Sequence, residues 1–106
     1  MKDKNYKTYC YDIDGTLCSN GCQYEDAKPF RSVIDHLNNL YEEGNTIILF
    51  TSRGTVSGND WRALTEEQLA TWGVKYHELL MGKPHADVFI DDRAKNIDTW
   101  IKENNL

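Results

Sequence analysis

Cysteine is scarce in this sequence, and its scarcity excludes one class of small protein. The 106 residues include three cysteines, Cys10, Cys18 and Cys22. This low, odd number argues against a fold stabilised by disulfides. Cys18 and Cys22 have the spacing of half a zinc site, but no second pair accompanies them, and the histidines fall in different predicted elements. We expect free thiols in a reducing cytosol.

Long hydrophobic runs and an excess of positive charge are also missing. No apolar run approaches the roughly 20 residues that a membrane-spanning helix needs. The charged N-terminus, residues 1–5, is not followed by the apolar stretch of a signal peptide. The formal net charge of −5 disfavours nucleic acid as a partner. We therefore expect a cytoplasmic location and no membrane partner.

What is present is the composition of one globular domain. The chain is 40% hydrophobic and 27% charged, which is ordinary for such proteins. Its length fits a single core, and no repeat, low-complexity tract or linker divides it. We expect one domain over residues 1–106.

Short apolar runs alternate with helical patterns along the chain. The predicted strands cover residues 7–11, 46–50, 74–80 and 88–90, and the predicted helices cover residues 29–43, 65–72 and 94–103. The second helix is expected to start at Thr65, because Thr65 and Gln68 resemble a capping box. The alternation indicates an α/β fold with a mostly parallel sheet.

The first helix and the second strand carry the clearest patterns. Apolar residues repeat at three- and four-residue spacing along this helix and form one stripe, Phe30, Val33, Ile34, Leu37, Leu40 and Tyr41. Residues 46–50 are a continuous apolar run, which predicts a central parallel strand covered on both faces. The segment from Asp14 to Lys28 has few candidates for the core and predicts a loop.

Polar side chains follow each predicted strand at the point where it ends. In chain order they are Asp12 and Asp14, then Thr51, Ser52 and Arg53, then Lys83, and then Asp91 and Asp92. Because ligands of open α/β sheets bind beyond the carboxyl ends of the strands, we expect these groups to meet in one crevice.

The residue types in this set favour metal-assisted phosphoryl chemistry. Four carboxylates in a partly dry site repel one another, and a divalent cation resolves the conflict. Ligation by oxygen alone suits Mg²⁺. An ammonium and backbone N–H groups nearby suit a phosphate, and carboxylates are established nucleophiles for phosphoryl transfer.

The same residues resemble the four signatures of the haloacid dehalogenase superfamily. The first signature is matched by Asp12-Ile13-Asp14-Gly15-Thr16, the second by Thr51-Ser52-Arg53, the third by Lys83 in Gly82-Lys83-Pro84, and the fourth by Ile90-Asp91-Asp92. Each signature alone is weak, but here all four occur in order and at strand ends. The resemblance extends from about Tyr6 to Ile101.

The resemblance implies a role for each acidic residue. Asp12 would attack the phosphorus and form an aspartyl-phosphate. Asp14 would protonate the leaving oxygen and then activate the water that hydrolyses the intermediate. Mg²⁺ would be held by the Asp12 carboxylate, the Asp14 backbone carbonyl and the Asp91 carboxylate. Asp92 would be a further ligand through water, or an orienting group.

It also implies roles for the groups that meet the phosphate. The Thr51 hydroxyl and the Ser52 amide would bind phosphoryl oxygens. Lys83 would neutralise the nucleophile and the transferring group. Two alternatives stay open for Arg53, which is either a substrate contact or one partner of a surface ion pair.

Neither the segment between Thr16 and the first predicted helix nor the single helix and strand between Arg53 and Lys83 has room for the cap domain of larger members. By resemblance, the fold would be a three-layer Rossmann-like core with strand order 3-2-1-4 and no cap, similar to the short phosphatases of capsular polysaccharide biosynthesis. Its open site would need a macromolecular substrate, a neighbouring subunit or the loop of residues 17–25 to exclude water. Its short sheet edges permit a homo-oligomer.

The sequence thus supports a Mg²⁺-dependent phosphomonoesterase acting on a small phosphorylated metabolite. Only the resemblance points to a sugar phosphate. Two alternatives remain: a phosphatase for a macromolecular phosphate, such as a polynucleotide end or a phosphoprotein, and a non-catalytic module that binds phosphoryl groups.

Overall fold

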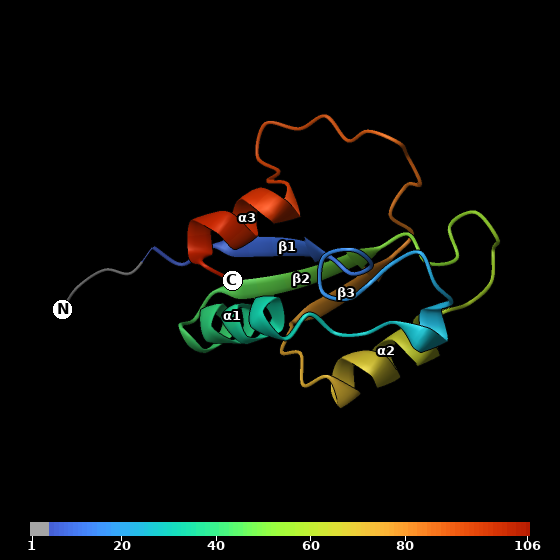
Figure 1. Cartoon of the computed structure of the whole chain (residues 1–106), viewed down its shortest axis with the longest axis horizontal. Coiled ribbons are helices and arrows are strands. Elements are labelled where there is room, and N and C mark those ends of the chain that lie inside the picture. The colour runs from blue at the N-terminus through green and yellow to red at the C-terminus, as the bar shows by residue number, and fades with distance from the viewer. Residues whose placement is uncertain (1–4) are drawn as a thin grey trace.

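The computed structural model describes residues 5–106 and has an α/β architecture (Figure 1). In chain order its elements are β1 (Thr8–Asp12), the short 3-10 helix η1 (Tyr24–Asp26), α1 (Arg31–Glu42), β2 (Thr46–Thr51), α2 (Arg62–Thr71), β3 (Glu78–Met81) and α3 (Ile97–Asn104). Residues 1–4, part of the segment on which the expectation of no signal peptide depends, lie outside the described chain. Within it, no helix is long and apolar enough to cross a membrane.

The sheet has three parallel strands in the order β1-β2-β3. Tyr9 pairs with Ile47, and Tyr11 pairs with Leu49, which in turn pairs with Leu79. Because paired residues point to the same face and alternate along each strand, these side chains share one face of the sheet. All five are buried or partly buried, so this face of the sheet forms one side of the hydrophobic core.

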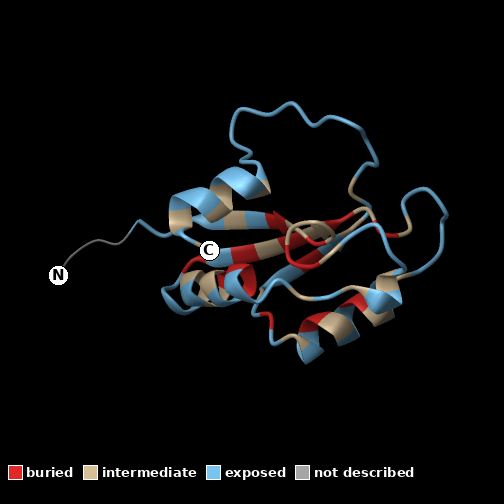
Figure 2. Cartoon of the chain, viewed as in Figure 1, coloured by how far each residue is buried: buried red, intermediate tan, exposed pale blue. Residues whose placement is uncertain are grey.

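All three helices pack on that one face. The core joins Leu37 of α1 and Leu69 of α2 to the sheet, and Trp100 of α3 packs against it. The ring of Trp100 lies 5.9 Å from Tyr9, and it also meets His36 of α1 at 5.6 Å. Figure 2 shows the buried residues gathered between the strands, α1 and α2.

The opposite face of the sheet is less covered than the sequence indicates. Cys10 and Leu80 are exposed, and Ile48 and Phe50 are only partly buried. The prediction that residues 46–50 are covered on both faces is therefore wrong for the described chain. The three-layer arrangement is not seen either, because no helix within residues 5–106 lies over this second face.

The predicted fourth strand is not formed. Residues 82–96 run as a long loop from β3 to α3, arching away from the sheet (Figure 1). Within this loop Val88, Phe89 and Ile90 are 71%, 51% and 95% exposed. An apolar run becomes a strand only by pairing with a partner, and in the described part of the chain no strand lies beside the outer edge of β1. The observed order contains the 3-2-1 part of the predicted 3-2-1-4.

Three predicted boundaries also differ from the observed elements by three residues or more. The helix α3 begins at Ile97, and not at residue 94. The helix α2 begins at Arg62, and not at Thr65, whose hydroxyl donates a hydrogen bond back to the Trp61 carbonyl at 2.7 Å. The strand β3 begins at Glu78, and Val74 lies before it in the connection from α2. Gly44 does follow α1, with a φ of 101° that favours glycine.

Candidate active site

The carboxyl ends of the three strands bring the first three groups of predicted site residues to one edge of the sheet. Strand β1 ends at Asp12 and β2 ends at Thr51, while Lys83 follows β3 by two residues. The backbone N–H of Lys83 donates to the Thr51 carbonyl at 2.9 Å, and the Thr55 hydroxyl donates to the Lys83 carbonyl at 2.8 Å. The turns after β2 and β3 are therefore joined directly.

Asp12 and Lys83 form a loose ion pair at this edge. The Lys83 ammonium lies 3.6 Å from one Asp12 carboxylate oxygen, and the two side chains are 21% and 34% exposed, respectively. Burial raises the pKa of Asp12 above its ordinary value, and the positive charge of Lys83 opposes that shift without cancelling it. The ammonium also lies 4.6 Å from the centre of the Phe89 ring. Asp12 is thus a partly desolvated carboxylate that faces a cation.

Asp14 is held by a different cation, Arg53. The guanidinium donates from Nε to Oδ2 at 2.9 Å and from Nη2 to Oδ1 at 2.8 Å. The Arg53 side chain is 0% exposed, and that of Asp14 is 22% exposed. Burial alone would lower the pKa of Arg53, but the hydrogen bonds and charge of Asp14 outweigh it and raise that pKa. Arg53 is therefore in an ion pair in which the guanidinium is buried and the carboxylate is partly exposed.

The chain from Ile13 to Cys18 contributes to the core, which the sequence did not reveal. Ile13, Leu17 and Cys18 are fully buried. The Ile13 carbonyl accepts the N–H of Leu17 at 2.8 Å, which folds the chain back on itself directly after β1. Burial raises the pKa of Cys18 to about 12, so its thiol stays protonated. The tight turn at Gly15 in Asp-Gly-Thr was the available signal that this segment is ordered.

Thr51 is buried at the end of β2. Its hydroxyl oxygen accepts the backbone N–H of Arg53 at 3.1 Å, which fixes the turn that carries Ser52. Ser52 is partly buried and Arg53 points inward toward Asp14. The residues of this turn therefore lie at the same edge as Asp12 and Asp14, as the sequence predicts.

Asp91 and Asp92 are not brought to this edge. Both lie in the exposed loop of residues 82–96. Asp91 accepts the backbone N–H of Arg93 at 2.7 Å, and this bond is the main cause that lowers its pKa. Across residues 5–106, no three His, Cys, Asp or Glu side chains lie close enough together to hold a metal ion.

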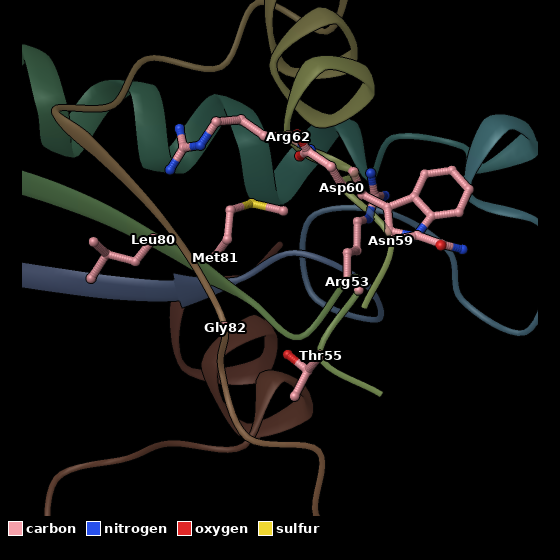
Figure 3. A pocket seen from close by; sticks show the side chains of 10 residues that line it. Arg53, Thr55, Asn59, Asp60, Arg62, Leu80, Met81 and Gly82 are labelled. Atoms are coloured by element: carbon pink, nitrogen blue, oxygen red, sulfur yellow. The ribbon is translucent and has the colours of Figure 1, made fainter. Parts of the chain in front are cut away.

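A pocket of about 480 Å³ lies beside these groups. Its walls come from the loop between β2 and α2 and from the end of β3, and include Arg53, Thr55, Asn59, Asp60, Arg62 and Met81 (Figure 3). Gly82 also lines it, directly before Lys83. Arg53 links the pocket to the strand ends, because it lines the pocket and also donates to Asp14, whereas Asp12 and Asp14 are not part of the pocket lining.

Together the fold and this edge define a small α/β protein with an open parallel sheet and a polar crevice at its carboxyl end. No family model and no curated protein matches the sequence. Among solved structures, a structural genomics target from Vibrio cholerae is 31% identical, with a TM-score of 0.77 over 89% of this chain and 86% of that chain. The chain belongs to the same structural family as that protein.

A second solved structure shares the fold alone. A chain in the Pnkp1/Rnl/Hen1 complex is 24% identical, with a TM-score of 0.59. The match covers 95% of this chain but 34% of that one, so the chain corresponds to about a third of the larger protein.

Proposed function

We propose that the chain is a Mg²⁺-dependent phosphomonoesterase of the haloacid dehalogenase superfamily. The observation that carries the proposal is the contact between the Asp12 carboxylate and the Lys83 ammonium, at the edge that also holds Asp14 and Thr51. A partly desolvated carboxylate can act as a nucleophile, and an ammonium beside it can neutralise an arriving phosphoryl group.

The proposed reaction proceeds in two displacements. An Asp12 oxygen attacks phosphorus, and the bond between phosphorus and the ester oxygen breaks as the aspartyl-phosphate forms. Asp14 gives a proton to the departing alcohol. It then takes a proton from the water that attacks the intermediate, which restores Asp12 and releases inorganic phosphate. The Thr51 hydroxyl, the Ser52 amide and Lys83 would hold the phosphoryl oxygens in line.

The candidate ligands are all oxygen atoms, the donor type that Mg²⁺ prefers. The Asp12 carboxylate and the Asp14 backbone carbonyl are oxygen donors at the end of one strand, and Asp91 would supply a further carboxylate. Bound there, the metal would neutralise charge on the phosphoryl oxygens. The exposed position of Asp91 means that the loop of residues 82–96 has to rearrange before the set is complete.

We further propose that residues 88–90 add to the free edge of β1 as a fourth parallel strand. Exposure of three consecutive apolar side chains is unfavourable, and an edge strand has unpaired N–H and C=O groups to offer. This pairing would give the order 3-2-1-4. It would also place Asp91 and Asp92 just beyond the new strand, next to the end of β1.

The pocket beside Arg53 has the volume for the alcohol part of a small ester. A sugar phosphate is the candidate that the family resemblance suggests. The exposed thiols of Cys10 and Cys22 fit a cytoplasmic location.

The test is release of phosphate from a panel of small monoesters, with Mg²⁺ and with EDTA. We expect turnover that requires the metal and is lost in Asp12→Asn, while the control Asp87→Asn, an exposed carboxylate of the 82–96 loop, keeps it. A phosphorylated oligonucleotide in the same panel separates a small-molecule from a macromolecular substrate. Binding of vanadate without turnover of any ester would instead support a non-catalytic module.

A further inference from the structure

All five N–H groups of Arg53 have partners inside the protein. A guanidinium offers one N–H at Nε and two at each terminal nitrogen. Nε and Nη2 donate to Asp14, Nη1 donates to Thr65 Oγ1 at 3.1 Å and to Gln68 Oε1 at 2.6 Å, and Nη2 reaches Cys18 Sγ at 4.0 Å. In this arrangement no N–H of Arg53 is free to bind a phosphate.

Separate parts of the chain fix the guanidinium. The Tyr24 ring covers it, with 4.7 Å between the ring centre and the guanidinium carbon. Gln68 of α2 connects Tyr24 to Arg53. Its Nε2 donates to the Tyr24 carbonyl at 2.6 Å, and its Oε1 accepts from Arg53. Arg53 therefore cannot turn toward Asp12 without breaking contacts to both α2 and the loop after β1.

The two oxygens of Asp14 are used unequally. Oδ1 accepts from Arg53 Nη2 and faces the Cys18 thiol at 3.5 Å, whereas Oδ2 accepts from Arg53 Nε alone. A carboxylate oxygen has two acceptor positions, so Oδ2 keeps one that is not used. The side chain of Asp14 is 22% exposed, so the pair with Arg53 leaves part of this carboxylate open to solvent.

We infer that Arg53 is a positioning residue that aims Asp14 Oδ2 at the ester oxygen, with Gln68 as its anchor, and that Arg53 does not bind the phosphate. The inference rests on the proposed function and deepens it. A planar fork fixes the orientation of a carboxylate, which the single ammonium of lysine cannot do.

The first test separates positioning from phosphate binding. In Arg53→Gln and Arg53→Lys we expect kcat/KM for an alkyl phosphate to fall about 100-fold, since misplacing a catalytic group has effects of that size. The inhibition constant of inorganic phosphate should not change. The control Arg31→Gln removes an exposed arginine of α1 and should change neither quantity. Weaker inhibition by phosphate in the Arg53 variants would overturn the inference.

The second test uses the leaving group. An aryl phosphate with an acidic leaving group needs little help from a proton donor, so its kcat/KM should fall much less than that of the alkyl ester. The double variant Asp14→Asn, Arg53→Gln should be no slower than Asp14→Asn alone, because both substitutions disable the same pair of side chains. Equal losses for both esters, or additive losses in the double variant, would contradict positioning.

Gln68→Ala is a less disruptive variant that tests the inference even if the Arg53 variants do not fold. Removing one partner of a buried ion pair is strongly destabilising, so thermal unfolding of each variant is followed by circular dichroism. Gln68→Ala keeps the ion pair and should show the same leaving-group pattern with a smaller loss. If the wild-type chain hydrolyses no ester, the proposed function fails and the inference fails with it. If the wild type is active and the Arg53 and Gln68 variants match it, only the inference fails.

Discussion

Asp12 and Asp14 are two residues apart, yet they meet different cations in different ways. Asp12 has one loose contact of 3.6 Å with Lys83, whereas Asp14 accepts two short hydrogen bonds from Arg53. A carboxylate that must attack phosphorus needs a free oxygen and room to move toward it. One that transfers a proton needs a fixed orientation. The two environments fit these two proposed roles.

At the residue scale, the first prediction concerns how far the charged Asp12 carboxylate lowers the stability of the folded chain. The pKa of Asp12 is raised in the folded chain, so folding takes up a proton at pH values between the ordinary pKa and the raised one. Stability should therefore fall as pH rises through that window. In EDTA we expect Asp12→Asn to melt at a higher temperature than the wild type at neutral pH, and this gain should vanish below the ordinary pKa of aspartate. A gain that does not depend on pH would contradict burial as its cause.

Lys83 should behave differently from Arg53, because its ammonium faces Asp12, the proposed nucleophile, and in the proposed reaction it contacts the phosphoryl group. We expect Lys83→Met to lower kcat about 100- to 1,000-fold, the range seen when one transition-state donor is removed. Inhibition by inorganic phosphate should also weaken. Lys102→Met, an exposed change on α3, is the matched control. Steady-state kinetics on one alkyl ester check both variants, and unchanged phosphate inhibition in Lys83→Met would count against the assigned role.

At the scale of elements, local patterns predicted most of the fold. The apolar stripe of α1 and the continuous run of β2 are determined by neighbours in sequence, and both elements form where expected. The ends of β1 and β2 also fall at Asp12 and Thr51, as the sequence predicts. These features depend on periodicity and on turn residues, which a single sequence contains.

Features that depend on distant contacts could not be predicted in the same way. Thr65 and Gln68 have the spacing of a capping box, but the same spacing puts both on one face of a helix, where they bind Arg53 instead. The full burial of the Arg53 side chain depends on partners in α2 and in the loop after β1, so no local pattern predicts it. Residues 88–90 have the composition of a strand, but whether they pair depends on the free edge of β1.

A prediction at this scale tests the proposed fourth strand. If residues 88–90 pair with β1 when Mg²⁺ and vanadate bind, the exchange of β1 backbone amides should slow on that edge. Amides of β2 are already bonded within the sheet and provide the internal control. Ile90→Pro removes one N–H from the new strand and should abolish the slowing. Hydrogen exchange followed by NMR measures this, and equal β1 exchange with and without ligands would refute the pairing.

For the whole molecule, the proposed metal would join the two ends of the chain. Asp12 lies at the end of β1, and Asp91 lies in the loop before α3. A cation bound to both carboxylates would hold that loop against the sheet in a chain whose net charge is negative. A ligand that binds only the folded state stabilises it by mass action, by about 2.7 kcal/mol at 100 times its dissociation constant. We expect Mg²⁺ to raise the melting temperature of the wild type accordingly. Asp91→Asn should remove most of that rise, while Asp87→Asn, an equal loss of charge in the same loop, should leave it intact. If both variants lose the rise equally, the effect of Mg²⁺ is general screening of negative charge, and Asp91 is not a ligand.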